Sequence, residues 1–86
     1  MAATVTVYTT DPCSFCARVK QLLNARQIAF DEVNLAKDPD GRAELARTTG
    51  LMTFPQILVD GEPIGGFREL MAYDRSGGLD ELKAAA

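Results

Sequence analysis

The 86-residue sequence predicts an α/β fold with its elements in the order βαβαββα. A strand pattern, a helix pattern and a second strand pattern follow one another over residues 4–35, which is typical of a βαβ unit. Two short apolar runs flank Asp60-Gly61, a dipeptide that suits the positive φ angles of a tight hairpin turn. No repeat, linker or low-complexity segment interrupts these patterns, so we expect one domain over residues 1–86.

The βαβ unit begins with a strand over residues 4–9, which are rich in β-branched and aromatic side chains. A helix is expected from Ser14 to about Arg26 and a second strand over residues 28–35. The two strands should be parallel with a right-handed crossover. The turn before the helix then lies at the carboxyl end of a strand, where α/β sheets tend to bind ligands. Apolar residues recur at helical spacing at Cys16, Val19, Leu22 and Leu23.

The second half of the chain predicts a short helix and a hairpin. Asp40 is a candidate N-cap for a helix over 42–49 that ends at Gly50. The hairpin strands are expected over 56–59 and 62–64. Pro63 cannot donate a ladder hydrogen bond, so the second hairpin strand should be an edge strand.

Two further helices should close the chain. Gly65-Gly66 lets the backbone turn before a helix over about 68–75. The last short helix is expected over 79–86.

Composition excludes several function classes. Apolar residues make up 47% of the chain and charged residues 24%, with a net charge of −3 and no His. Nucleic-acid surfaces usually display clustered Lys and Arg, and no such cluster is present, so we expect no nucleic-acid partner. Without His, Cys-His catalysis and most zinc sites are excluded within one chain. No apolar run approaches the ~20 residues that cross a bilayer. We therefore expect a cytoplasmic protein without a membrane partner, and we also expect a monomer.

Cys13 and Cys16 are the candidate reactive residues. They stand three positions apart at the start of the expected helix, where such residues share one side. Free N–H groups and the helix dipole stabilise a thiolate there and can lower its pKa. In a reducing compartment such a pair favours redox or metal chemistry, although an inert thiol pair or a structural staple is the alternative.

Three motifs together resemble the dithiol glutaredoxins over nearly the whole chain. They are Cys13-Ser14-Phe15-Cys16 after a strand, Thr53-Phe54-Pro55 before the hairpin, and Gly65-Gly66 before a helix, with Leu79-Asp80 opening the last helix. The resemblance implies a thioredoxin-like fold, in which helices flank a four-stranded mixed sheet. It also implies a glutathione-dependent thiol-disulfide oxidoreductase, with glutathione as co-substrate and disulfide-containing proteins as partners.

The resemblance also assigns roles to the two cysteines and to the second motif. Cys13 would attack a glutathione mixed disulfide or a protein disulfide, and Cys16 would resolve the intermediate. Pro55 would be the family's cis-proline. It would leave the backbone of Phe54 free to pair with the cysteinyl part of glutathione.

Further residues match glutathione-contacting positions of the family. Amide groups near Gly66 and Phe67 would hold the γ-glutamyl carboxylate, and Glu69 would lie near the γ-glutamyl ammonium. Arg47 would face the glycine carboxylate, and Phe15 would form an apolar wall.

Departures from the family pattern leave two alternatives open. Thr10 stands where most members carry a basic residue. Ser14 replaces the commoner Pro, which is the pattern of branches whose first Cys, here Cys13, helps to ligate a 2Fe-2S cluster between two chains and two glutathiones. Phe67-Arg68 replaces the usual Cys-Asp and is similar to redoxins reduced by thioredoxin reductase.

Overall fold

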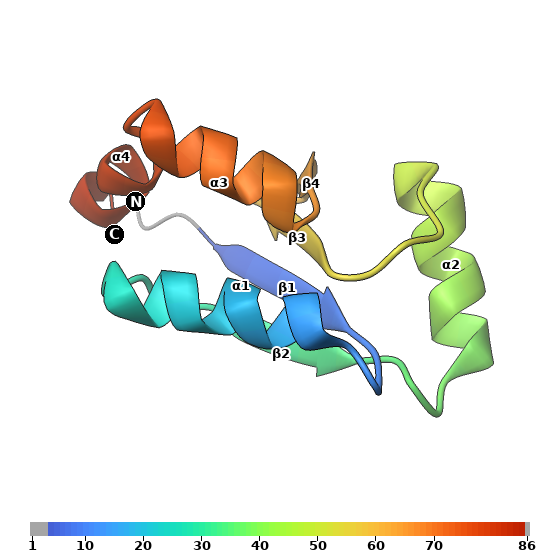
Figure 1. Ribbon diagram of the computed structural model, residues 1–86. Helices are drawn as coiled ribbons and strands as arrows, with labels where there is room; N and C mark the ends of the chain where they lie inside the picture. The colour runs from blue at the N-terminus through green and yellow to red at the C-terminus, as the bar shows by residue number, and fades with distance from the viewer. Residues whose placement is uncertain (1–3, 86) are drawn as a thin grey trace.

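The computed structural model describes residues 4–85 and contains one mixed sheet with the strand order β2-β1-β3-β4 (Figure 1). β1 (Val5–Thr9) pairs in parallel with β2 (Asp31–Asn34) and antiparallel with β3 (Gln56–Val59). β4 (Glu62–Gly65) pairs antiparallel with β3. The predicted βαβ unit, the hairpin and the four-stranded mixed sheet of a thioredoxin-like fold are confirmed.

Within residues 4–85, four helices accompany the sheet, namely α1 (Ser14–Ala25), α2 (Pro39–Thr49), α3 (Phe67–Arg75) and α4 (Gly78–Ala85). The helical end of the chain is divided into α3 and α4, so the order is βαβαββ followed by two helices. Ala86, the last position of the expected final helix, lies outside the described residues. α1 packs beside α3, while α2 stands apart from both (Figure 1).

The second strand is shorter than the expected 28–35. The Ile28 amide donates a hydrogen bond to the Leu23 carbonyl oxygen at 2.9 Å, so this part of the chain still completes the end of α1. Ile28, which precedes β2 in the sequence, and Leu35, which follows it, are both buried, whereas β2 itself is an exposed edge strand. The apolar residues of this segment therefore predicted burial correctly for Ile28 and Leu35 but not for Val33, which is 37% exposed, and the strand bounds were predicted too wide.

α2 also begins earlier than expected, because Asp38 and not Asp40 is its N-cap. The Asp38 side chain accepts a hydrogen bond from the Gly41 amide at 2.9 Å, and Pro39 occupies the first helical position. Gly50, with φ 75°, ends the helix as expected. The hairpin turn is confirmed, since Asp60 and Gly61 have φ angles of 51° and 84°.

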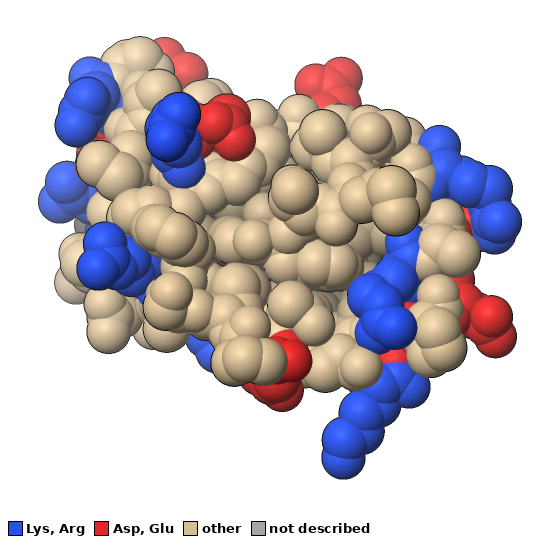
Figure 2. All heavy atoms as spheres, turned by 45° about the vertical axis from the view of Figure 1, so that its right-hand side comes forward, with Lys and Arg blue, Asp and Glu red and all other residues tan. Residues whose placement is uncertain are grey.

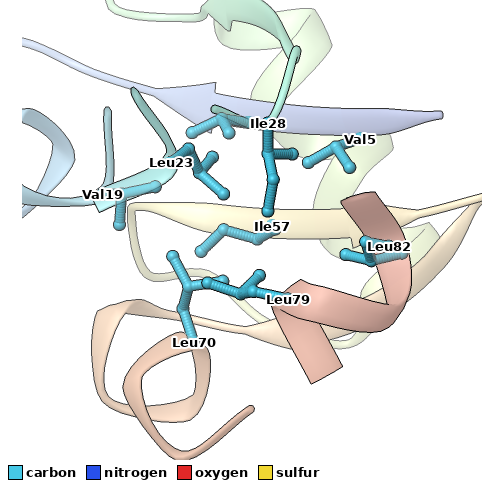
Figure 3. Packing of buried hydrophobic residues seen from close by; sticks show 9 residues of the cluster. Val5, Val19, Leu23, Ile28, Ile57, Leu70, Leu79 and Leu82 are labelled. Carbon is cyan, nitrogen blue, oxygen red and sulfur yellow. The ribbon is translucent and has the colours of Figure 1, made fainter. Parts of the chain in front are cut away.

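The core lies between the sheet and the helices α1, α3 and α4 (Figure 3). Ile57 of β3 is fully buried and faces side chains from both ends of the chain. This core holds the carboxyl end of β1 and the start of α1 in fixed relation. Among the described residues, no helix is long and apolar enough to cross a membrane. The buried cluster comprises Val5, Val7, Val19, Leu23, Ile28, Ile57, Leu70, Leu79 and Leu82.

Candidate active site

Cys13 is the N-cap residue of α1, and Cys16 lies in the first turn of the helix. Cys13 has extended backbone angles, and its Sγ accepts a hydrogen bond from the Cys16 amide at 3.1 Å. The sulfur thus takes the place of the side-chain oxygen of an ordinary N-cap. Cys13 is half-buried and Cys16 is 3% exposed. Solvent and substrates therefore have better access to Cys13.

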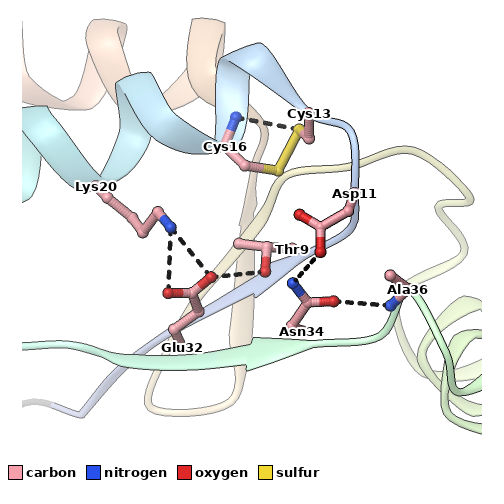
Figure 4. A network of polar contacts seen from close by, with 8 residues as sticks. All are labelled: Thr9, Asp11, Cys13, Cys16, Lys20, Glu32, Asn34 and Ala36. Atoms are coloured by element: carbon pink, nitrogen blue, oxygen red, sulfur yellow. Dashed lines mark hydrogen bonds and ion pairs between the residues drawn. A yellow bond between two sulfur atoms is a disulfide. The ribbon is translucent and has the colours of Figure 1, made fainter.

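The two sulfurs form a disulfide, with the Cα atoms 5.3 Å apart (Figure 4). This structure therefore represents the oxidised form of the pair. In the reduced form the same amide and the positive end of the α1 dipole favour a thiolate on Cys13. The first turn of α1 carries no acidic residue that would oppose this charge.

A polar network beneath the disulfide fixes the turn between β1 and α1 (Figure 4). Asn34 Nδ2 donates to Asp11 Oδ2 at 3.0 Å, and Asn34 Oδ1 accepts from the Ala36 amide at 2.9 Å. Asp11, the acid next to the site, is therefore anchored to β2. Sequence reasoning missed this contact because it joins two segments 23 residues apart.

A second branch of the network joins α1 to β2. Glu32 Oε2 accepts from the Thr9 hydroxyl at 2.9 Å and pairs with Lys20 Nζ at 3.2 Å. Glu32 and Asn34 alternate along β2, and this spacing places both on one face. That alternation is the signal from which the network could have been found.

A groove of about 770 Å³ extends from Phe15 along the turn before β3 to the start of α3. The structure brings six of the seven expected glutathione-contacting residues to its lining. The Phe54-Pro55 peptide bond is cis, as the resemblance implied. The six residues are Phe15, Phe54, Pro55, Gly66, Phe67 and Glu69.

Arg47 is the expected residue that does not line the groove. It lies on α2 with its side chain exposed and forms an ion pair with Glu44 on the same helix. The planar guanidinium is thus engaged within α2 in this structure.

Glu69 caps α3. Its Oε1 accepts a hydrogen bond from the Gly66 amide at 2.8 Å. The Gly66 amide, expected to face a ligand carboxylate, is therefore occupied by a protein carboxylate. The amides of the first turn, beginning with Phe67, have no acceptor within the helix.

Phe15 and Phe67 form one aromatic wall of the groove. Their ring centroids lie 5.7 Å apart, and the Arg18 guanidinium lies 5.4 Å from the Phe15 centroid. Phe15 is 51% exposed. Sequence reasoning identified both rings separately and missed their contact with each other and with Arg18.

Leu51 and Met52 extend the apolar surface beyond the groove. Leu51 lines the groove and is 39% exposed, and Met52 is 84% exposed. Figure 2 shows a broad central area without charged side chains, with Lys and Arg on both sides. Sequence reasoning passed over these two residues, although their position directly after a helix-ending glycine was a signal of exposure.

Comparisons with known proteins agree with one another. The family model "Glutaredoxin" matches residues 5–64. The chain is 43% identical over 81 residues to a glutaredoxin of Pseudomonas aeruginosa, covering 94% of this chain and 96% of that protein. It is 39% identical over 80 residues to glutaredoxin 3 of Escherichia coli, covering 93% and 96%.

Solved structures give the same picture. The buckwheat glutaredoxin-glutathione complex superposes with a TM-score of 0.83 at 29% identity, covering 93% of this chain and 76% of that chain. A glutaredoxin from Brucella melitensis superposes with a TM-score of 0.79 at 38% identity, covering 92% and 86%.

Proposed function

The chain belongs to the glutaredoxin family of glutathione-dependent thiol-disulfide oxidoreductases, and we propose that Cys13 is its nucleophile and Cys16 its resolving residue. The observation that carries this assignment is the hydrogen bond from the Cys16 amide to Cys13 Sγ at the start of α1. It stabilises charge on the more accessible sulfur, while Cys16 is buried behind it.

The proposed reduction of a protein disulfide has two exchange steps. The Cys13 thiolate attacks one substrate sulfur, the substrate S–S bond breaks, and the released substrate thiolate takes up a proton. Cys16 then loses its proton and attacks Cys13 Sγ. The mixed disulfide breaks, the second substrate thiol leaves, and the Cys13–Cys16 disulfide of this structure forms. Two electrons have passed to the substrate.

Two glutathione molecules return the enzyme to its reduced form. One glutathione thiolate attacks Cys13 Sγ and releases Cys16 as a thiol. The second attacks the sulfur of the bound glutathione, which leaves as glutathione disulfide and frees the Cys13 thiolate. Glutathione mixed disulfides of other proteins enter this sequence through the same glutathione-bound state.

We propose that glutathione occupies the groove beside Phe54-Pro55. The buckwheat relative is a complex with glutathione, and the groove here ends at the start of α3, where free amides attract a carboxylate. Because Glu69 already accepts from the Gly66 amide, the Phe67 amide is the better donor for the γ-glutamyl carboxylate. Phe15 supplies the apolar wall. Arg47 would have to leave Glu44 to reach the glycine carboxylate.

The roles of the two cysteines are tested by two serine variants. We expect Cys13→Ser to lower glutathione-dependent reduction of every disulfide to the uncatalysed rate, because no attacking sulfur remains. Cys16→Ser should keep most activity on a glutathionylated peptide and lose it on an intramolecular protein disulfide. Full activity of Cys13→Ser with glutathione would overturn the assignment.

Two alternatives from the sequence stay predictions. Phe67-Arg68 favours thioredoxin reductase as an electron donor, and turnover with each reductase system separates the two donors. Ser14 favours a 2Fe-2S cluster shared by two chains. The described residues contain no group of three or more His, Cys, Asp or Glu side chains that could hold a metal ion, so the cluster would need Cys13 of both chains and glutathione sulfurs. Iron and sulfide analysis after anaerobic reconstitution tests it.

We also propose a single glutaredoxin domain over 1–86 that acts as a cytoplasmic monomer. One buried cluster that joins β1 to α4 supports the single domain. A redox-type cysteine pair suits a reducing compartment. Size-exclusion chromatography of the reduced protein tests the monomer.

A further inference from the structure

A second groove runs between α1 and α3, on the other side of the Phe15–Phe67 wall. It has a volume of about 480 Å³, and its lining includes Arg18, Phe67, Met71, Asp74 and Arg75. Phe67 and Met71 also line the groove beside Phe54-Pro55. The α1–α3 groove therefore adjoins the groove beside Phe54-Pro55, and Phe67 and Met71 form their common border.

The α1–α3 groove carries a net positive charge. Among the described residues that line it, Asp74 is the one carboxylate, and it accepts two hydrogen bonds of 3.0 Å each from Arg26. These hydrogen bonds hold the pKa of Asp74 below its usual value, so the carboxylate stays ionised and paired. Within the described residues, neither Arg18 nor Arg75 has a carboxylate within ion-pair distance.

This local charge is opposite to that of the whole chain, which has a net charge of −3. Arg68, at the start of α3, lines the adjoining groove and adds a third guanidinium to Arg18 of α1 and Arg75 of α3. Figure 2 shows Lys and Arg side chains at the left with acidic side chains among them, and a second group of Lys and Arg at the right. The complementary ligand for this surface is an anion that extends along it.

We propose that the α1–α3 groove docks an acidic segment that flanks the target cysteine of a protein substrate. Arg18 lies five residues along α1 from Cys13, a rise of about 7.5 Å, and Arg75 lies about 12 Å along α3 from Phe67. An extended chain covers about 3.3 Å per residue. An acidic side chain about two residues from the reacting cysteine therefore reaches Arg18, and one about four residues beyond the point where the segment passes Phe67 reaches Arg75.

The length of the surface favours a protein segment as its ligand. A glutathione in the groove beside Phe54-Pro55 is separated from Arg75 by the aromatic wall and most of the length of α3. A longer segment of a protein substrate, with its reacting cysteine at Cys13, can extend from there along the α1–α3 groove. The inference rests on the proposed function, because the docked segment must present its disulfide to Cys13.

The test compares matched peptides that carry one internal disulfide. One peptide has one Asp two residues from a cysteine and a second Asp four to six residues from it, and the other has Asn at the same positions. At low ionic strength, we expect wild-type protein with glutathione to reduce the acidic peptide with the higher kcat/KM. Arg75→Gln should lower this preference by about two- to fivefold, the range of an exposed ion pair. High salt should remove the preference through screening.

Lys37→Gln is the matched control, because Lys37 is an exposed cation between β2 and α2, away from the α1–α3 groove. It should leave the preference unchanged. A charge exchange sharpens the test: Arg75→Glu should prefer a peptide with Lys in place of Asp. Equal rates for the Asp and Asn peptides, or the same loss with Lys37→Gln, would overturn the docking proposal.

Two further measurements separate this proposal from the activity on which it rests. Reduction of hydroxyethyl disulfide needs no docked segment, so Arg75→Gln should match wild type in that assay. Failure of wild type in that assay would count against the proposed function itself. A raised KM for glutathione in Arg75→Gln would overturn the docking proposal by showing that the groove serves glutathione.

Discussion

A single hydrogen bond distinguishes the two otherwise similar cysteines. The Cys16 amide donates to Cys13 Sγ, and the bond exists because Cys13 occupies the N-cap rather than the first turn. The sequence predicted the helix start, and the spacing of three then fixed which residue could reach the amide. The asymmetry between an accessible and a buried sulfur was therefore predictable from two positions.

Gly65 is a residue whose replacement should damage the site through the fold. Its φ is 126°, and a Cβ there would lie 2.7 Å from Glu69 Cγ. We expect Gly65→Ala to destabilise the protein by about 2 to 3 kcal/mol, since an L side chain is strained at this angle and must displace the cap of α3. Urea unfolding followed by circular dichroism measures the change.

Gly50→Ala is the control for this substitution. Gly50 also has a positive φ, of 75°, but a Cβ there meets no atom within 4 Å. Its cost should be smaller, about 1 to 2 kcal/mol, because only the left-handed backbone contributes. Equal costs at the two glycines would show that the contact with Glu69 contributes nothing.

An ion pair joins α1 and α3 at the end that lies away from the reactive cysteines. Arg26, at the carboxyl end of α1, binds Asp74 of α3 through two hydrogen bonds. The hydrogen bond to Asp74 raises the pKa of Arg26, and the bond to Arg26 lowers that of Asp74. The pair is exposed to solvent, so its effect on stability should be small and salt-dependent.

The pH dependence of stability tests this pair. A carboxyl whose pKa is lower in the folded state stabilises the protein above its unfolded pKa, and this contribution is lost as the pH falls through the folded value. Asp74→Asn should therefore lower the melting temperature slightly at pH 7 and have less effect at the acid end of the range. Arg26→Gln should reproduce the same profile.

A double variant completes the measurement. Because the two side chains interact mainly with each other, Arg26→Gln with Asp74→Asn should cost less than the two single effects added together. Additive effects at pH 7 would contradict a coupled pair. Asp80→Asn is a matched acidic control, since Asp80 has a weaker influence on Arg26 than Asp74 has.

Among the helices, strands and turns, the sequence predicted correctly those features that depend on the backbone preferences of one or two residues. Asp60-Gly61 produced the hairpin because the two residues suit positive φ angles, and Gly50 ended α2 for the same reason. β2 was predicted too long, because Ile28 is buried by the end of α1 rather than by strand pairing. The cap of α2 was misplaced by two residues, because Asp38 and Asp40 flank the same proline and only the contact with Gly41 selects between them.

The candidate site was predictable to the extent that its parts are local motifs. The resemblance assigned Phe15, Phe54, Pro55 and Gly66 to one glutathione-binding site, and all four line one groove. Contacts that depend on tertiary packing were missed. Arg18 reaches Phe15, and Asp11 reaches Asn34, through a geometry that no sequence spacing specifies.

The whole molecule depends on one core that joins the first and last elements of the chain. Leu79 of α4 is fully buried in the same cluster as Val5 of β1 and Val19 of α1. A chain of this size buries a modest share of its surface and has a total stability of only about 5 to 15 kcal/mol. One large cavity in this core should therefore affect the reactive site, even though α4 does not touch it.

The last prediction tests whether the chain is one cooperative domain. Leu79→Ala should destabilise the protein by about 2 to 5 kcal/mol, through lost burial and the cavity left behind. Because Cys16 is buried and α1 packs on the same core, loss of helix signal and exposure of the reduced Cys16 thiol should follow the same urea curve in the variant. Met52→Ala, at a position that is 84% exposed, should leave that curve unchanged. Two separate transitions, with Leu79→Ala shifting only one, would contradict a single domain and would require the redox site to be stabilised independently of α4.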